Sequence, residues 1–124
     1  MALENAVEGC VRETYGALVG AYQAATAKHP QIKETISQLV QDEIQHASLS
    51  LAIWQWASPQ LSKAERAQIA EIQAATVASL RAAAHERHAE ELYSEAGYPQ
   101  TDVALGMLDA LQGSLWSGDG PASA

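Results

Sequence analysis

Phenylalanine is absent from this chain, cysteine occurs once, and basic residues are few. Because Cys10 is the only cysteine, no disulfide can form within the chain, and we expect a reducing, cytoplasmic compartment. The 7 Lys and Arg residues are outnumbered by 15 Asp and Glu residues, which gives a formal net charge of -8. This balance argues against nucleic acid and anionic membrane surfaces as partners, and it is compatible with binding cations.

Long apolar runs and strand-like alternation are also missing. No stretch approaches the ~20 apolar residues of a membrane span. The N-terminal MALENAVEG has neither the basic start nor the apolar segment of a signal peptide, so none is expected. Good helix formers dominate instead, and we expect an all-α protein. The 124 residues suit a single domain over residues 1–117, followed by a disordered, Gly/Ser/Pro-containing tail over residues 118–124.

Punctuating residues divide the chain into helical segments. Pro30, Pro59 and Pro99 each disfavour helix at the residue before them. Ser62 begins a capping-box sequence, SKAE, and Gly97 is a candidate C-cap. The expected helices therefore cover residues 3–28, 31–57, 62–96 and 101–117. Short loops between them predict an antiparallel helical bundle of two long helices, a third long one and a short fourth.

Glu43 and His46 lie three residues apart in the second segment, within the stretch QDEIQHASL. At about 100° per residue, Glu43 falls in the middle of an apolar stripe and His46 about 60° away. The other members of this stripe are Ile32, Ile36, Leu39, Val40, Ala47, Trp54 and Ala57. A carboxylate on a buried face is costly unless it is paired, protonated or bound to a metal. The spacing places carboxylate and imidazole one turn apart, so they can share an iron, manganese or zinc ion.

The first segment carries a carboxylate in a similar position. Glu13 falls on a stripe of small residues that would let another helix approach closely: Ala6, Gly9, Cys10, Gly16, Ala17, Gly20 and Ala24. Glu13, Glu43 and His46 are therefore candidate metal ligands. In the alternative interpretation, Glu43 and His46 bond each other, Tyr15 or Tyr22 in a satisfied polar core.

Two pieces of sequence resemble bacterial ferritin-like proteins, which have one helix of the type EGC-x-x-E-T and a following helix of the type DE-x-x-HA-x-L. EGCVRETYGAL contains Glu13, and QDEIQHASLSLAIW contains Glu43 and His46. The resemblance covers roughly residues 4–57. In ferritin-like proteins, one helix pair gives a Glu and a Glu-x-x-His and a second pair gives the same set, which together hold two iron ions. The resemblance implies Glu13, Glu43 and His46 as ligands.

One such helix pair is only half of a diiron site. Two copies of the chain related by a two-fold axis would restore four Glu and two His, as the resemblance to encapsulated ferritins with their interfacial iron site implies. Alternatively, the chain is the later half of a longer ferritin-like protein. We favour a homodimer or higher homo-oligomer with two iron ions per dimer, or manganese in their place. The implied reaction is a ferroxidase reaction, the oxidation of Fe(II) by oxygen, with bridging carboxylates and terminal histidines.

Two other function classes stay open at this point. A non-catalytic helical interaction module would leave its acidic groups solvated or paired with each other, without bound metal. A diiron oxidase of an organic substrate would require an apolar pocket beside the ions.

The stretch AHERHAEEL is the other concentration of metal-binding side chains. His85, Glu86, His88 and Glu91 could form a second metal or entry site, but Arg87 among them favours a solvated face.

Several further residues have simpler expected roles. Cys10 shares the stripe of Glu13 and is expected to be a buried, inert thiol. Trp54 and Trp56 are expected in the core or at a dimer interface. Gly113-Ser114-Leu115 faintly resembles the peptides that direct cargo into encapsulin shells, so such a shell is a further candidate partner.

Overall fold

The computed structural model describes residues 2–114 and residue 116. The helices in chain order are α1 (Ala2–Glu4), the π-helix η1 (Asn5–Glu13), α2 (Thr14–Thr26), α3 (Pro30–Ala57), the 3-10 helix η2 (Ser58–Gln60), α4 (Lys63–Ala84), α5 (Glu90–Ser94) and α6 (Thr101–Ser114). The described residues contain no strand, so the all-α prediction is confirmed. None of their helices is both long and apolar enough to cross a membrane. Leu115 and the predicted tail at 118–124 lie outside the described residues.

The first three elements form one continuous rod, which we call the N-terminal helix. Glu4 and Glu13, at the two junctions, both have helical backbone angles. The rod ends at Thr26, because Ala27 adopts an extended ψ of 134° ahead of Pro30. The helix expected at residues 3–28 is therefore present, with a π-helical segment that the sequence did not indicate.

Local signals fix the beginning of the next two long helices. Pro30 is the first residue of α3, and His29 caps it by accepting the Ile32 N–H at Nδ1, 3.4 Å away. Ser62 caps α4: its hydroxyl accepts the Glu65 N–H and its N–H donates to the Glu65 carboxylate, both at 3.0 Å. These hydrogen bonds lower the pKa of Glu65. The predicted capping box is confirmed.

The third helix does not reach residue 96 as predicted. It ends at Ala84, whose carbonyl accepts the Thr101 hydroxyl at 2.7 Å. The following segment folds back onto the end of the N-terminal helix, where the Gln23 side chain donates to the Ala96 carbonyl at 3.0 Å. Contacts between distant parts of the chain thus override the helix propensity of residues 85–96.

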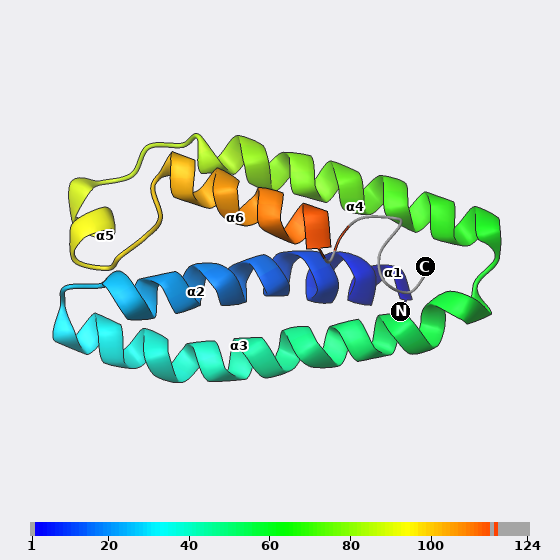
Figure 1. The fold of residues 1–124 in the computed structure, drawn as a ribbon, viewed down its shortest axis with the longest axis horizontal. Helices are drawn as coiled ribbons and strands as arrows, with labels where there is room; N and C mark the ends of the chain where they lie inside the picture. Colours follow the sequence, from blue (N-terminus) through cyan, green and yellow to red (C-terminus); the bar gives the residue numbers. More distant parts are fainter. Residues whose placement is uncertain (1, 115, 117–124) are drawn as a thin grey trace.

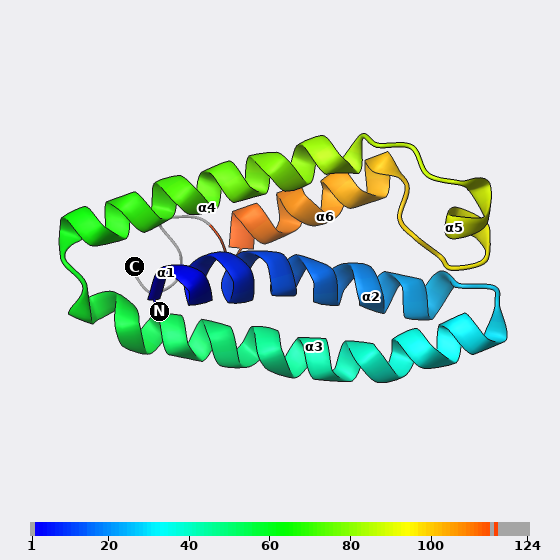
Figure 2. The same cartoon turned by 180° about the vertical axis from the view of Figure 1, so that it is seen from behind.

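The N-terminal helix lies in the middle of the fold (Figure 1). The long helix α3 runs antiparallel along one side of it, and α4 and α6 lie on the other side, as both views show (Figures 1 and 2). The core lies on both sides of the N-terminal helix, against α3 on one side and against α4 and α6 on the other, and its largest fully buried side chains are Val11 and Leu108. The N-terminal helix covers one face of α3, so the remaining faces of α3 are open in the single chain.

Candidate metal centre

The N-terminal helix is widened into a π-helix over the nine residues that end at Glu13. Two carbonyls of this segment accept hydrogen bonds from distant side chains. Gln73 Nε2 donates to the Ala6 carbonyl at 2.9 Å, and Trp116 Nε1 donates to the Cys10 carbonyl at 2.7 Å. These donors stabilise the wide turns, which are rare in proteins and frequent at functional sites.

The wide turns change which residues of the N-terminal helix are buried. Val11 and Thr14 are buried although they fall outside the predicted small-residue stripe, whereas Gly16, within that stripe, is exposed. A π-helix turns through a smaller angle per residue than an α-helix, so a projection at 100° drifts from the true faces across η1. The predicted stripe was therefore wrong at Gly16 and did not include the buried Thr14, whereas Val11 belongs to the bulky apolar wall expected beside the stripe.

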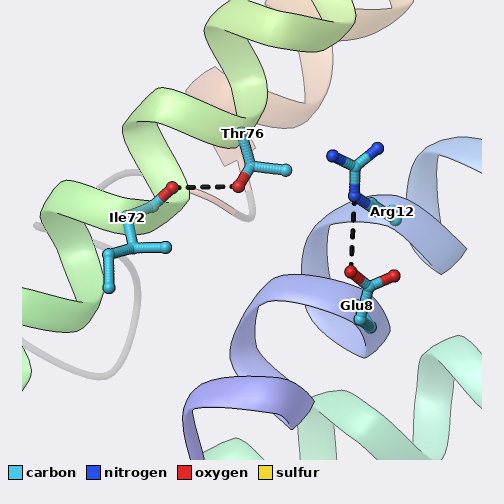
Figure 3. A network of polar contacts seen from close by, with 4 residues as sticks. All are labelled: Glu8, Arg12, Ile72 and Thr76. Atoms are coloured by element: carbon cyan, nitrogen blue, oxygen red, sulfur yellow. Dashed lines mark hydrogen bonds and ion pairs between the residues drawn. The ribbon is translucent and has the colours of Figure 1, made fainter.

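Polar side chains of η1 and α4 have partners within their own helices. Figure 3 shows η1 beside α4, with Arg12 Nε 3.5 Å from the Glu8 carboxylate and the Thr76 hydroxyl bonded to the Ile72 carbonyl at 2.9 Å. Thr76 is thereby satisfied within its own helix and can be buried. Arg12 pairs with Glu8 and not with Glu13, which takes part in none of the ion pairs found among the described residues.

The contacts between the N-terminal helix and α3 fix their register. Cys10 Sγ donates to the Ser50 carbonyl at 3.3 Å, and a Cβ added at Gly20 would lie 3.2 Å from a methyl carbon of Val40. Residue 10 therefore lies beside residue 50 and residue 20 beside residue 40. By this register, Glu13 lies level with residue 47. His46 and Glu43 precede residue 47 on α3 by one and four residues. Measured along the helix axis, both therefore lie within about 6 Å of the level of Glu13.

Glu43 and His46 are less buried than predicted. The Glu43 side chain is 42% exposed and that of His46 57% exposed, and His46 Nδ1 lies 3.9 Å from Glu43 Oε1. The prediction that both lie on a buried face is wrong for His46, because no element covers its side of α3, whereas Glu43 is partly buried between Val40 and Ala47. The alternative of a satisfied polar core containing the pair is not observed either, since water reaches both side chains.

A largely apolar seam runs along α3 and includes His46. Its members alternate at spacings of three and four residues: Leu39, Asp42, His46, Leu49, Ile53 and Trp56. This is the a/d pattern by which two helices pair. The four apolar members are 36–67% exposed, so the α3 seam faces water in the single chain. The spacing is visible in the sequence, but the single-face projection used above did not separate it from the stripe that packs on the N-terminal helix.

Cys10 is buried as expected and lies one turn before Glu13. Burial, reinforced by the negative charge of Glu13, raises the pKa of the Cys10 thiol to about 11. The thiol therefore stays protonated at neutral pH and is a poor metal ligand or nucleophile.

Within the described residues, no three His, Cys, Asp or Glu side chains gather closely enough to hold a metal ion by themselves. What one chain offers at this level is two half-buried carboxylates and one imidazole, Glu13, Glu43 and His46. Oxygen and nitrogen donors of this kind fit iron, manganese or zinc. The donor set fits such a metal, although a single chain leaves its coordination incomplete.

The remaining candidates lie apart from this level. His85, Glu86, His88 and Glu91 are all exposed around the loop between α4 and α5, as expected for a solvated face. Trp54 is half-buried on α3, whereas Trp56 is 67% exposed on the α3 seam. Gly113 and Ser114 end α6 and are exposed, and Leu115 of the cargo-like tripeptide lies outside the described residues.

Comparisons of the chain with protein-family models, with curated proteins and with solved structures found no match. The resemblance to ferritin-like proteins therefore stays a prediction that rests on the residues described above.

Proposed function

We propose that the chain is a ferritin-like protein in which two copies pair along the α3 seam and bind two iron ions between them. The observation that carries this proposal is the position of His46 at the middle of an exposed apolar seam, with Glu43 one turn away on the same helix and Glu13 level with them. An apolar face of this length on one helix is costly to leave in water, and a second copy would cover it.

A two-fold axis supports this arrangement geometrically. In an antiparallel helix pair, an axis at the middle of the seam, between His46 and Leu49, sets Leu39 against the partner's Trp56. Measured along the helices, both copies of His46 and both copies of Glu13 would then lie within about one turn of the axis. Four Glu and two His would surround the space between the subunits, which is the donor set implied by the ferritin-like resemblance.

In such a dimer, Glu13 and Glu43 supply carboxylate oxygens and His46 supplies an imidazole nitrogen. Fe(II) bound there would be oxidised to Fe(III), with oxygen as the electron acceptor. No ion pair neutralises Glu13 within the described residues, so its charge is available to a cation. Covering the seam would exclude water from the ligands and strengthen their attraction for the metal. Manganese is the alternative metal with the same preference for these donors.

The proposal is tested by metal analysis of protein purified without a chelator and loaded with Fe(II). We expect about one iron per chain at saturation, as two ions per dimer require. Glu43→Ala should lose at least half of this iron. Glu34→Ala is the matched control, because Glu34 lies on the opposite side of α3 and is exposed. Bound iron that survives Glu43→Ala unchanged would contradict the assignment of the site.

The oligomeric mass, measured by light scattering on the same samples, separates the proposal from its main competitor. A non-catalytic interaction module is favoured by the same exposed α3 seam, which pairs helices with or without metal. A dimer that takes up no iron in the unmodified protein would support that module. A stable monomer with iron bound would exclude a site shared between two chains.

A further inference from the structure

A small cavity lies at the opposite end of the N-terminal helix from η1, where α2 ends and α6 begins. Its volume is about 220 Å³, and its walls include Tyr22, Thr26, Tyr93, Tyr98, Gln100 and Asp102. The candidate ligands Glu13, Glu43 and His46 do not line it. We call this cavity the tyrosine pocket, since three of these walls are phenol rings.

Hydrogen bonds hold the loop wall of the tyrosine pocket against α2. The Thr26 hydroxyl lies within hydrogen-bond distance of the Tyr22 carbonyl, at 2.8 Å, and of the Gly97 carbonyl, at 3.1 Å. The N–H groups of Lys28 and His29 both donate to the Glu95 carbonyl at 3.1 Å. Gly97 has a φ of +67°, and a Cβ there would lie 2.6 Å from the backbone nitrogen of Ala27. Only glycine allows this approach, so the wall is fixed by the backbone and the pocket is preformed.

The aromatic walls are also held in place. The rings of Tyr93 and Tyr98 are 6.5 Å apart and inclined at 52°, so they form adjoining walls and not a stack. The Tyr93 hydroxyl accepts the His88 N–H at 3.1 Å, and the His88 ring meets Tyr98 edge-on at 5.2 Å. These contacts keep both rings beside the cavity without a ligand.

The charge of the tyrosine pocket is negative. Asp102 is the charged residue among those that line it, with no Lys or Arg beside it in the lining. Asp102 is exposed and belongs to none of the ion pairs found among the described residues. The chain as a whole also carries a net charge of -8. Anions are therefore disfavoured in this pocket.

We propose that the tyrosine pocket binds a small organic cation with an alkylated ammonium head. Aromatic faces attract such cations within about 6 Å of the ring centre, and they need no hydrogen bond from the ligand. A carboxylate at the rim, here that of Asp102, adds direct charge attraction. The volume exceeds the ~30 Å³ of one water and is below the ~300 Å³ of pockets for drug-sized ligands, which limits the ligand to a small head group.

The test is a titration of the metal-free protein with tetramethylammonium and choline, followed by NMR or calorimetry. The matched neutral probe is 3,3-dimethylbutan-1-ol, which has the shape of choline without its charge. We expect saturable binding of both cations and at least ten-fold weaker binding of the neutral alcohol. Equal binding of choline and the alcohol would show a merely apolar pocket and overturn the proposal, as would the absence of saturable cation binding.

Variants locate the binding and guard against misfolding. Tyr98→Leu should weaken choline binding about ten-fold, the upper range of one cation–π contact. Asp102→Asn, on the surface, should weaken it several-fold without affecting the helical circular dichroism. Asp109→Asn is the matched control on α6. Asp109 forms an ion pair with Arg81, with 2.8 Å between their atoms, and it does not line the pocket. Choline affinity that is the same in Asp102→Asn and in the unmodified protein would contradict an ammonium site at this rim. These measurements use metal-free protein, so their outcome does not depend on whether the proposed iron site exists.

Discussion

At Gly9 the N-terminal helix has no room for a side chain. An added Cβ would lie 2.5 Å from Ser50 Cβ on α3, which is closer than real Cβ contacts allow. At Gly16, on the same helix, an added Cβ would meet no atom within 4 Å. Two glycines of one helix therefore have opposite reasons for being small: the first lets α3 approach, and the second faces open space in the single chain.

These environments predict opposite effects of the same substitution. Gly9→Ala should lower the free energy of unfolding by about 1–3 kcal/mol, the usual cost of overpacking. Gly16→Ala should raise it by up to about 1 kcal/mol, because alanine favours the helix. Urea unfolding of the metal-free protein measures both. Adding Ser50→Gly to Gly9→Ala should restore much of the loss. If the two alanine variants behave alike, the close packing described at Gly9 is wrong.

At the candidate site, the helical projection and the ferritin-like resemblance nominated Glu13, Glu43 and His46 from the sequence. Their exposure could not be predicted in the same way, because it depends on which element covers each face of α3. The sequence places His46 about 60° from the centre of an apolar stripe. It does not indicate that the N-terminal helix leaves the His46 side of α3 uncovered.

The π-helix is the element that links the candidate site to the rest of the fold. Trp116, beyond the end of α6, donates its indole N–H to the Cys10 carbonyl one turn before Glu13. Trp116→Phe keeps an aromatic side chain and removes that donor, so η1 should lose about 1 kcal/mol of local stability. Hydrogen–deuterium exchange should become several-fold faster in residues 5–15.

Trp56→Phe serves as the control for this prediction, because Trp56 is exposed on α3 and makes no contact of this kind with η1. It should leave exchange in the N-terminal helix unchanged. Unaltered exchange in Trp116→Phe would contradict this prediction, because it would show that other contacts stabilise the π-helix η1.

Elements were predictable where their signals are local. Pro30 and the Ser62 capping box each place a helix start from a few neighbouring residues, and both starts were confirmed. The end of α4 at Ala84 and the wide turns of η1 depend on Thr101, Gln73 and Trp116, which lie far away in the sequence. Helix propensity contains no information about such partners, which is why these two features were missed.

On the scale of the whole molecule, α3 is a long helix with one covered face. We expect Ile53→Glu to place a charge in the α3 seam, to convert the proposed dimer to monomer, and to abolish the proposed iron binding with it. Ile44→Glu is the matched control, since Ile44 is 44% exposed on the other side of the same helix. Light scattering and circular dichroism separate loss of pairing from loss of folding. A dimer that persists in Ile53→Glu would place the interface elsewhere.

The single covered face of α3 also has a consequence for mass action. If the ligands of one site come from two chains, the concentration of complete sites falls with the square of the protein concentration once the chains separate. Dilution would then release iron from an unaltered protein, and added iron would draw monomers together. The iron affinity measured for this chain should therefore rise with protein concentration, whereas choline binding at the tyrosine pocket should not.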